Sequence, residues 1–355
     1  RKIIRIGSCR MEIVKLTFDK DKTAIIKGFA ILFMIILHCG AQDSYLTILP
    51  AFVKHPNLPN ITGVFKLCVG IFTFMVGYGY AYSKNKDLKY SILHIKRLLI
   101  PFWSILLITL PIIVSRGDFN LKIFLLNLIG INSVYNYFSW FVAFYIYAMI
   151  IMPLVSRIID KRMYVGTSLF ICIAYVLEVA IHQFIPNYTE NDWLQRLFDC
   201  FSMTPIMLIG YLFARKKFFT SIRIPDKWYM LPVAMLLIAL IFVARYCKGS
   251  ILGFNLDFIY APIFILSILI IFSMYNLHYV SCIMQLLGKY SVYMWFIHAL
   301  FFTGATRDVF QPAILISDNL FIITTWTIVV TFMVSVVMSH IVEFVQQRLT
   351  SLFSK

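Results

Sequence analysis

The first long apolar stretch of the chain reads AIIKGFAILFMIILHCG over residues 24–40. A helix that crosses a bilayer needs about 20 mostly apolar residues, and this stretch comes close to that length with one charged residue in it. No small-residue cleavage site closes it and further apolar runs follow, so it does not read as a cleaved signal peptide. It therefore predicts the first membrane-spanning helix.

Apolar runs of this kind recur along the chain. Hydrophobic residues make up 61% of the 355 residues and charged residues 14%, which is more apolar surface than a soluble core of this size can bury. A segment over residues 120–131 is too short to span and is expected at the membrane interface. The predicted fold is all-α, a polytopic transmembrane helix bundle of about ten spans. The runs that predict these spans lie near residues 24–40, 63–83, 98–115, 137–155, 164–185, 198–214, 229–246, 255–275, 282–303 and 319–344.

Basic residues are distributed unevenly between the segments that join these runs. Alternate segments, from residues 1–27 to the tail after residue 344, hold 24 of the 32 Lys and Arg residues, and the remaining segments hold 8. The positive-inside rule then places both termini in the cytoplasm, and we expect a bacterial-type cytoplasmic (inner) membrane. The net charge of +16 is a topology signal, so we expect membrane lipids and not nucleic acid as partners.

No internal repeat or linker divides the chain. We expect a basic cytoplasmic leader over residues 1–23, one membrane domain over residues 24–344 and a short cytoplasmic tail over residues 345–355. Residues 1–10 carry no pattern that supports the first span, so insertion and activity are expected to survive when the chain begins at Met11. The seven cysteines are scattered and lack CxxC spacing, which predicts neither a disulfide framework nor a metal site.

A lysine and two histidines stand out, because polar groups inside a span are costly and mark candidate functional sites. Lys27 and His38 are eleven residues apart in the first span. That is about 16 Å and three turns along a helix, so both project from a similar face. His298 ends the ninth span at nearly the depth of His38, and the two imidazoles could line one cavity. A membrane anchor at Lys27 and histidines bonded to backbone carbonyls are equally consistent with these positions.

Other polar and aromatic residues are weaker candidates. Glu178 lies inside the fifth span and could orient or charge-balance a histidine, or simply hydrogen-bond a neighbouring helix. Lys96 and Arg97 precede Pro101 at the inner end of the third span, where they could meet a phosphate or act as a positive-inside pair. Trp140 lies at the outer interface, where an aromatic belt residue is equally expected.

Four segments together resemble the acyltransferase-3 family of integral membrane acyltransferases, in the family's order and over nearly the whole chain. Val76 replaces the Ser that is usual in the second segment, and Ala24 stands where many members have Asp. No extracytoplasmic esterase-like domain follows the last span, so the chain resembles the single-domain members. The segments are Lys27-x10-His38; Val69 to Tyr78, followed by Lys96-Arg97-Leu-Leu-Ile-Pro101; Trp140-Phe141 with Tyr147 and Pro153; and Leu287-Gly288-Lys-Tyr-Ser291 through His298.

The resemblance implies an O-acyltransferase that moves an acyl group from cytoplasmic acyl-CoA, with acetyl-CoA favoured, to a hydroxyl of a cell-surface or lipid-linked glycan, as in polysaccharide modification by O-acetylation. No metal is implied. A histidine can take a hydroxyl proton at neutral pH, so His38 would act as general base or briefly carry the acyl group. The implied site residues are His38, His298 and Glu178 for catalysis, Lys27, Lys96 and Arg97 for the donor phosphates, and Trp140, Tyr147 and Ser291 for substrate binding.

The main alternative belongs to a different class: a transporter or flippase of a lipid-linked sugar, in which the histidines and Glu178 form a proton relay. Transporters often carry internal repeats and paired helices broken by Gly or Pro, and the sequence has neither.

Overall fold

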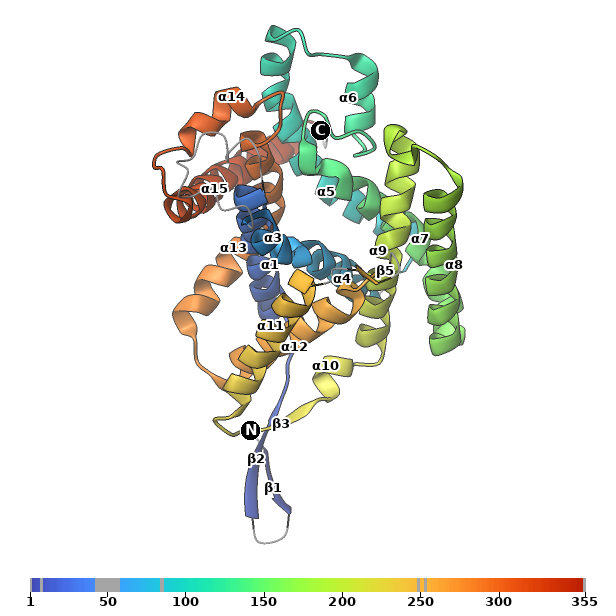
Figure 1. Cartoon of the computed structure of the whole chain (residues 1–355), viewed down its shortest axis with the longest axis vertical. Coiled ribbons are helices and arrows are strands. Elements are labelled where there is room, and N and C mark those ends of the chain that lie inside the picture. The colour runs from blue at the N-terminus through green and yellow to red at the C-terminus, as the bar shows by residue number, and fades with distance from the viewer. Residues whose placement is uncertain are drawn as a thin grey trace.

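The structure is a computed structural model and describes residues 2–6, 9–41, 58–83, 86–247, 250–251 and 254–353. Helices make up nearly all of it (Figure 1). In chain order the elements are β1 Lys2–Ile6, β2 Cys9–Lys15, α1 Lys20–Ala41, α3 Leu58–Gly63, η1 Val64–Lys66, α4 Leu67–Ala81, α5 Leu88–Ser115, α6 Leu121–Asn127, η2 Tyr137–Ser139, α7 Trp140–Lys161, α8 Met163–Phe184, η3 Tyr188–Glu190, α9 Asp192–Arg215, α10 Phe218–Ser221, β3 Arg223–Pro225, α11 Met230–Cys247, β4 Ser250–Ile251, β5 Phe254–Asn255, α12 Asp257–Met274, α13 His278–His298, η4 Ala299–Phe301, α14 Arg307–Phe310, η5 Gln311–Ala313 and α15 Leu320–Phe353.

The long helices coincide with the predicted spans. Within the described residues, nine helical stretches are long and apolar enough to cross a membrane. The remaining predicted span, the ninth, is α13, which has 21 residues but is less apolar because it carries Gln285, Lys289 and a histidine at each end. The predicted polytopic helical bundle is therefore confirmed, and the chain is a multi-pass membrane protein. The interfacial segment forms α6, which has seven residues and is too short to span.

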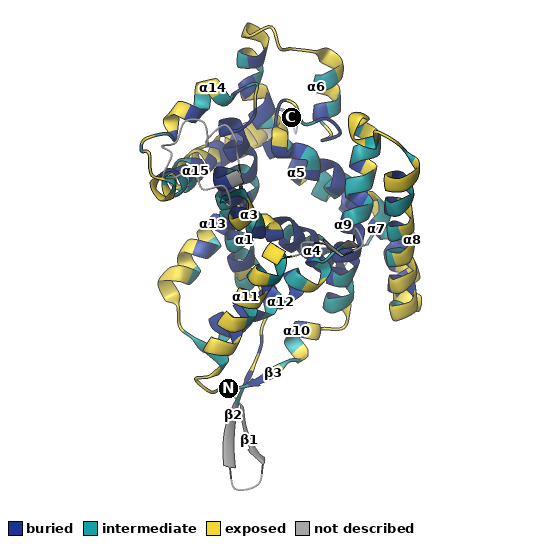
Figure 2. Cartoon of the chain, in the orientation of Figure 1, coloured by how far each residue is buried: buried dark blue, intermediate teal, exposed yellow. Residues whose placement is uncertain are grey.

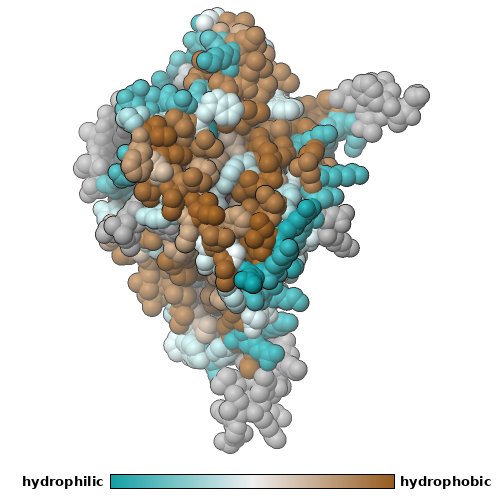
Figure 3. All heavy atoms as spheres, turned by 90° about the vertical axis from the view of Figure 1, so that its right-hand side faces the viewer, coloured by the Kyte–Doolittle hydropathy of each residue, from teal (hydrophilic) through white to brown (hydrophobic). Residues whose placement is uncertain are grey.

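The helices divide into a buried centre and an exposed periphery. The most apolar stretch of α1 is 61% buried, whereas that of α11 is 11% buried. Figure 2 shows the same contrast between α4 and α8. The exposed side chains are largely apolar, and Figure 3 shows a broad hydrophobic face bordered by a hydrophilic band. An apolar surface of this extent indicates contact with lipid.

A small antiparallel sheet joins the N-terminal segment to the chain between α10 and α11. β2 lies between β1 and β3, and Val14 pairs with Ile224. The sheet protrudes at one end of the molecule (Figure 1). α1 begins at Lys20, four residues before the predicted start of the membrane domain.

α1 and α13 lie against each other at the centre of the bundle, in direct backbone contact. A Cβ atom added to Gly28 would lie 2.2 Å from the carbonyl oxygen of Met284, and one added to Gly288 would lie 1.9 Å from that of Ala24. Small residues that let two backbones approach are typical of helix interfaces in membranes. Because His38 lies in the last turn of α1 and His298 ends α13, this contact also fixes the ends that carry the candidate site.

We expect Gly288→Ala to destabilise the protein, because its methyl group would push α13 away from the α1 backbone. Overpacking of this kind costs about 1–3 kcal/mol. Thermal unfolding of the purified protein in detergent should give a clearly lower Tm. Gly304→Ala is the matched control, because nothing lies within 4 Å of its added Cβ. Equal Tm values for the two variants would contradict the backbone contact.

Candidate active site

A cavity of about 560 Å³ lies among α1, α4, α5, α7 and α13, with η1 and η2 completing its wall. Its basic lining residues are Lys27, His38, Lys66, His94 and Arg97, and no Asp or Glu is among the described lining residues. Aromatic side chains form much of the remaining wall, from Phe72, Tyr80, Tyr90, Tyr137, Phe138, Trp140, Phe141, Tyr145 and Trp295. Within the described part of the chain, no group of three or more His, Cys, Asp or Glu side chains is placed to hold a metal ion.

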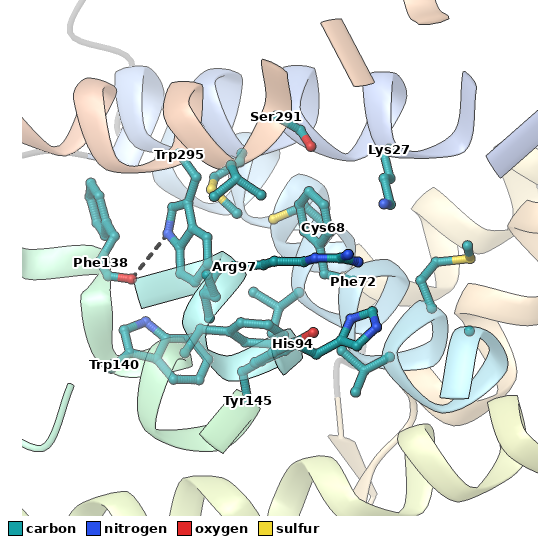
Figure 4. A pocket seen from close by; sticks show the side chains of 18 of the residues that line it. Lys27, Cys68, Phe72, His94, Arg97, Phe138, Trp140, Tyr145, Ser291 and Trp295 are labelled. Atoms are coloured by element: carbon teal, nitrogen blue, oxygen red, sulfur yellow. Dashed lines mark hydrogen bonds between the residues drawn. The ribbon is translucent and has the colours of Figure 1, made fainter. Parts of the chain in front are cut away.

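Three cationic or potentially cationic side chains gather on one side of this cavity. Figure 4 shows Lys27 of α1 opposite His94 and Arg97 of α5, while Phe138, Trp140 and Trp295 lie on the other side. His94 and Arg97 are three residues apart, which puts them on one face of α5. With no carboxylate in the lining, this side is suited to bind an anion, and Arg97 can bind a phosphate with two parallel hydrogen bonds.

A pair of histidines lies at the other end of the α1 wall. The Nδ1 atom of His38 is 2.9 Å from Nε2 of His298. His298 is fully buried, and its Nδ1 atom is 3.0 Å from the carbonyl oxygen of Met294. His38 is half-buried and lines the cavity, so the pair has one member in contact with the cavity and one behind it.

The hydrogen bonds determine which nitrogen of each neutral ring carries a proton. A carbonyl oxygen only accepts, so Nδ1 of His298 must donate to Met294. Nε2 of His298 is then unprotonated and accepts from Nδ1 of His38. Among the described residues, none is hydrogen-bonded to Nε2 of His38, whose lone pair is therefore free of them. The chain of bonds thus makes His38 Nε2 the basic atom of the site.

An aromatic ring stacks on the imidazole of His38. Phe138 stacks on His38 with ring centroids 3.5 Å apart and planes 14° from parallel. The carbonyl oxygen of Phe138 accepts a hydrogen bond of 3.1 Å from Nε1 of Trp295 (Figure 4). The backbone N–H of Tyr137 donates to Oγ1 of Thr303 over 3.0 Å. These bonds connect η2 to α13 and to the segment that follows η4, and so hold Phe138 beside the histidine pair.

Most of the predicted site residues meet at this cavity. Those that line it are Lys27, His38, Arg97, Trp140 and Ser291, with His298 directly behind His38. Ser291 is buried, and its hydroxyl group donates to the carbonyl oxygen of Gly288 over 2.9 Å.

Apart from His298, three predicted site residues do not line the cavity. Lys96 is exposed and lies two residues after the lining residue His94. Tyr147 lies two residues after the lining residue Tyr145. Residues two apart in a helix point in different directions, so both side chains are turned away from the cavity. The hydroxyl of Tyr147 is 3.2 Å from Oγ1 of Thr204 on α9. The carboxyl group of Glu178 is hydrogen-bonded with Ser202, also on α9. Both side chains thus serve contacts between helices.

His94, Lys66 and Phe138 are lining residues of interest that were not predicted. His94 could have been found from its spacing of three residues before Arg97. Lys66 has no motif around it that would have singled it out. Phe138 lies two residues before Trp140 and resembles any belt aromatic in sequence, because its stacking on His38 is created by the fold.

The fold and the site together define a polytopic membrane protein with a basic, histidine-containing cavity. Comparison with protein families gives a match to the acyltransferase-3 family, described as an acyltransferase domain, over residues 24–341. The match covers most of the chain, so the chain belongs to this family and is a membrane acyltransferase. The resemblance read from the four sequence segments is confirmed. No curated protein and no solved structure matches the chain.

We expect the histidine pair to react unequally with diethyl pyrocarbonate, which attacks an unprotonated ring nitrogen. His38 offers the free Nε2 atom to the cavity, whereas His298 is buried with both nitrogens hydrogen-bonded. Mass spectrometry of peptides after brief treatment should find His38 modified and His298 unmodified. The exposed His278 provides the positive control for reagent activity. Modification of His298 at the rate of His38 would rule out this hydrogen-bond arrangement.

Proposed function

We propose that the protein transfers an acyl group, with acetyl favoured, from cytoplasmic acyl-CoA to a hydroxyl of a cell-surface or lipid-linked glycan. One observation carries this proposal: a single cavity joins the cationic side formed by Lys27, His94 and Arg97 to the free nitrogen of His38. An anionic group can bind at the first place while a reacting carbonyl lies at the second. Membership of an acyltransferase family supplies the reaction class.

The distance between Lys27 and His38 supports acyl-CoA as the donor. Lys27 and His38 lie on one continuous helix, about 16 Å apart along its axis. The pantetheine arm of CoA is an extended chain of comparable length. Phosphates held by Lys27 and Arg97 would leave the arm between apolar side chains such as Met34 and Phe72, with the thioester near His38. With the basic segments in the cytoplasm, the donor enters from that side.

The histidine pair can then perform the transfer as a general base. Nε2 of His38 takes the proton of the acceptor hydroxyl, and the oxygen attacks the thioester carbonyl carbon. As the tetrahedral intermediate collapses, the carbon–sulfur bond breaks and the CoA sulfur receives the proton from His38. His298 accepts the bond from Nδ1 of His38 and so stabilises the protonated ring. The products are an acyl ester and free CoA.

The transporter alternative loses its support. It needs Glu178 to share protons with the histidines, but Glu178 is hydrogen-bonded with Ser202 and does not line the cavity. The family of the chain is one of acyltransferases.

The first prediction from this proposal concerns His38. His38→Ala removes the base, so transfer from labelled acetyl-CoA should fall about 10²- to 10⁴-fold while the protein stays folded. His298→Ala removes only the partner of the base, so a larger residual rate is expected. Specific activity and Tm should be measured on the same purified samples, with His278→Ala as the exposed-histidine control. A folded His38→Ala variant with normal turnover would refute the assignment.

The second prediction concerns the donor phosphates. Lys27→Ala and Arg97→Ala should each raise the KM for acetyl-CoA about tenfold or more, because a hydrogen bond to a charged group is lost. Lys27→Arg should be tolerated better than Lys27→Ala. Lys96→Ala is the matched control, since Lys96 adjoins Arg97 in sequence but does not line the cavity. Calorimetry of acetyl-CoA binding provides the direct check, and unchanged Kd values in both alanine variants would exclude this donor site.

A further inference from the structure

The transfer end of the cavity carries a cation that the transfer step described above does not use. The described lining has five Lys, Arg and His side chains and no Asp or Glu, and two of the five, His38 and Lys66, belong to this end. A Cβ atom added to Gly40 of α1 would lie 2.1 Å from the side chain of Thr62 in α3. α3 and the following turn η1, which contains Lys66, therefore lie against the end of α1 that carries His38. The ammonium group of Lys66 lies within electrostatic range of the His38 ring.

A buried ion pair holds the turn that presents Lys66. Nε of Arg245 donates to the carbonyl oxygen of Val64 over 3.0 Å, within the same turn η1. Arg245 also pairs with Asp257, and their side chains are 7% and 2% exposed. Asp257 packs against α4, because a Cβ atom added to Gly70 of α4 would lie 2.6 Å from the Cβ atom of Asp257. The carboxylates of Asp257 and of Asp199 on α9 lie within electrostatic range of Lys66. Each of them is already paired with an arginine, Asp257 with Arg245 and Asp199 with Arg196.

Lys66 itself forms no ion pair in the described part of the chain. No carboxylate among the described residues lies within ion-pair distance of its Nζ atom, and its side chain is exposed at the cavity. An ammonium group has three donors and no acceptor, so its natural partner is an anion. Neither a neutral sugar nor an acetyl group supplies one.

We propose, resting on the proposed function, that Lys66 binds a fixed negative charge, a carboxylate or phosphate, on the substrate at the transfer end. The charge has two possible sources that share this chemistry. It belongs to an acidic acceptor glycan, or it is the distal carboxylate of a dicarboxylic acyl group such as succinyl. In both cases the ion pair with Lys66 orients the substrate beside His38.

Binding measurements separate the two sources. Purified protein in detergent is titrated by calorimetry with acetyl-CoA and with succinyl-CoA, and the CoA-loaded protein with methyl glucoside and with methyl glucuronide. In each pair one member carries a carboxylate that the other lacks: succinyl adds a carboxymethyl group to acetyl, and the glucuronide has a carboxylate where the glucoside has a CH2OH group. Wild-type protein should prefer the anionic member of one pair. Lys66→Gln should reduce that preference roughly three- to tenfold, as for a partly exposed ion pair, whereas Lys66→Arg should retain it. Lys122→Gln, an exposed lysine of α6 that does not line the cavity, should change nothing.

Each outcome decides a separate point. A loss confined to succinyl-CoA assigns the charge to the acyl group, and a loss confined to the glucuronide assigns it to the acceptor. Binding of acetyl-CoA with no preference in either pair, or a preference that survives Lys66→Gln, overturns the inference and leaves the proposed function standing. Failure of wild-type protein to bind either acyl-CoA instead overturns the proposed function.

Discussion

The backbones of α1 and α13 approach so closely that neither Gly28 nor Gly288 leaves room for a side chain. The rest of the site depends on this contact. It positions the two helices so that Nδ1 of His38 lies 2.9 Å from Nε2 of His298. A histidine pair buried in a bundle needs partners for its nitrogens, since unpaired polar groups are costly away from water. The close approach of the helices and the backbone carbonyl of Met294 provide those partners without any further charged residue.

The described lining of the whole cavity also lacks acidic residues. Acidic residues of the bundle are engaged elsewhere: Asp257 with Arg245, Asp199 with Arg196, and Asp160 with Lys86 and Arg215. The described cavity lining therefore contains Lys, Arg and His side chains but no Asp or Glu to balance them. A potential of one sign inside a low-dielectric wall favours binding of oppositely charged ligands. Under the proposed function, that potential serves an anionic donor first, and the transfer end adds its own cation at Lys66.

The sequence predicted the architecture and the first-span pair because both depend on properties local to a segment. Hydropathy and length are sufficient to locate spans, and helical geometry is sufficient to place Lys27 and His38 on one face. Packing between distant helices is not encoded in this local way. Glu178 looked functional because a carboxylate in a span is costly, and the sequence could not reveal Ser202 on the next helix. Phe138 and Lys66 gain their positions only when η2 and η1 fold against α13 and α1.

The chain of hydrogen bonds behind His38 stops at a peptide carbonyl, which cannot take up a proton and pass it on. A proton that reaches Nε2 of His38 has no continuation along this chain and must leave from the atom at which it arrived. In the proposed reaction the hydroxyl gives up one proton and the CoA sulfur takes one, so the site only needs to store it between the two events. Catalysis of this kind consumes and releases no proton on either face of the membrane. Its equilibrium would therefore not respond to a pH gradient across the bilayer.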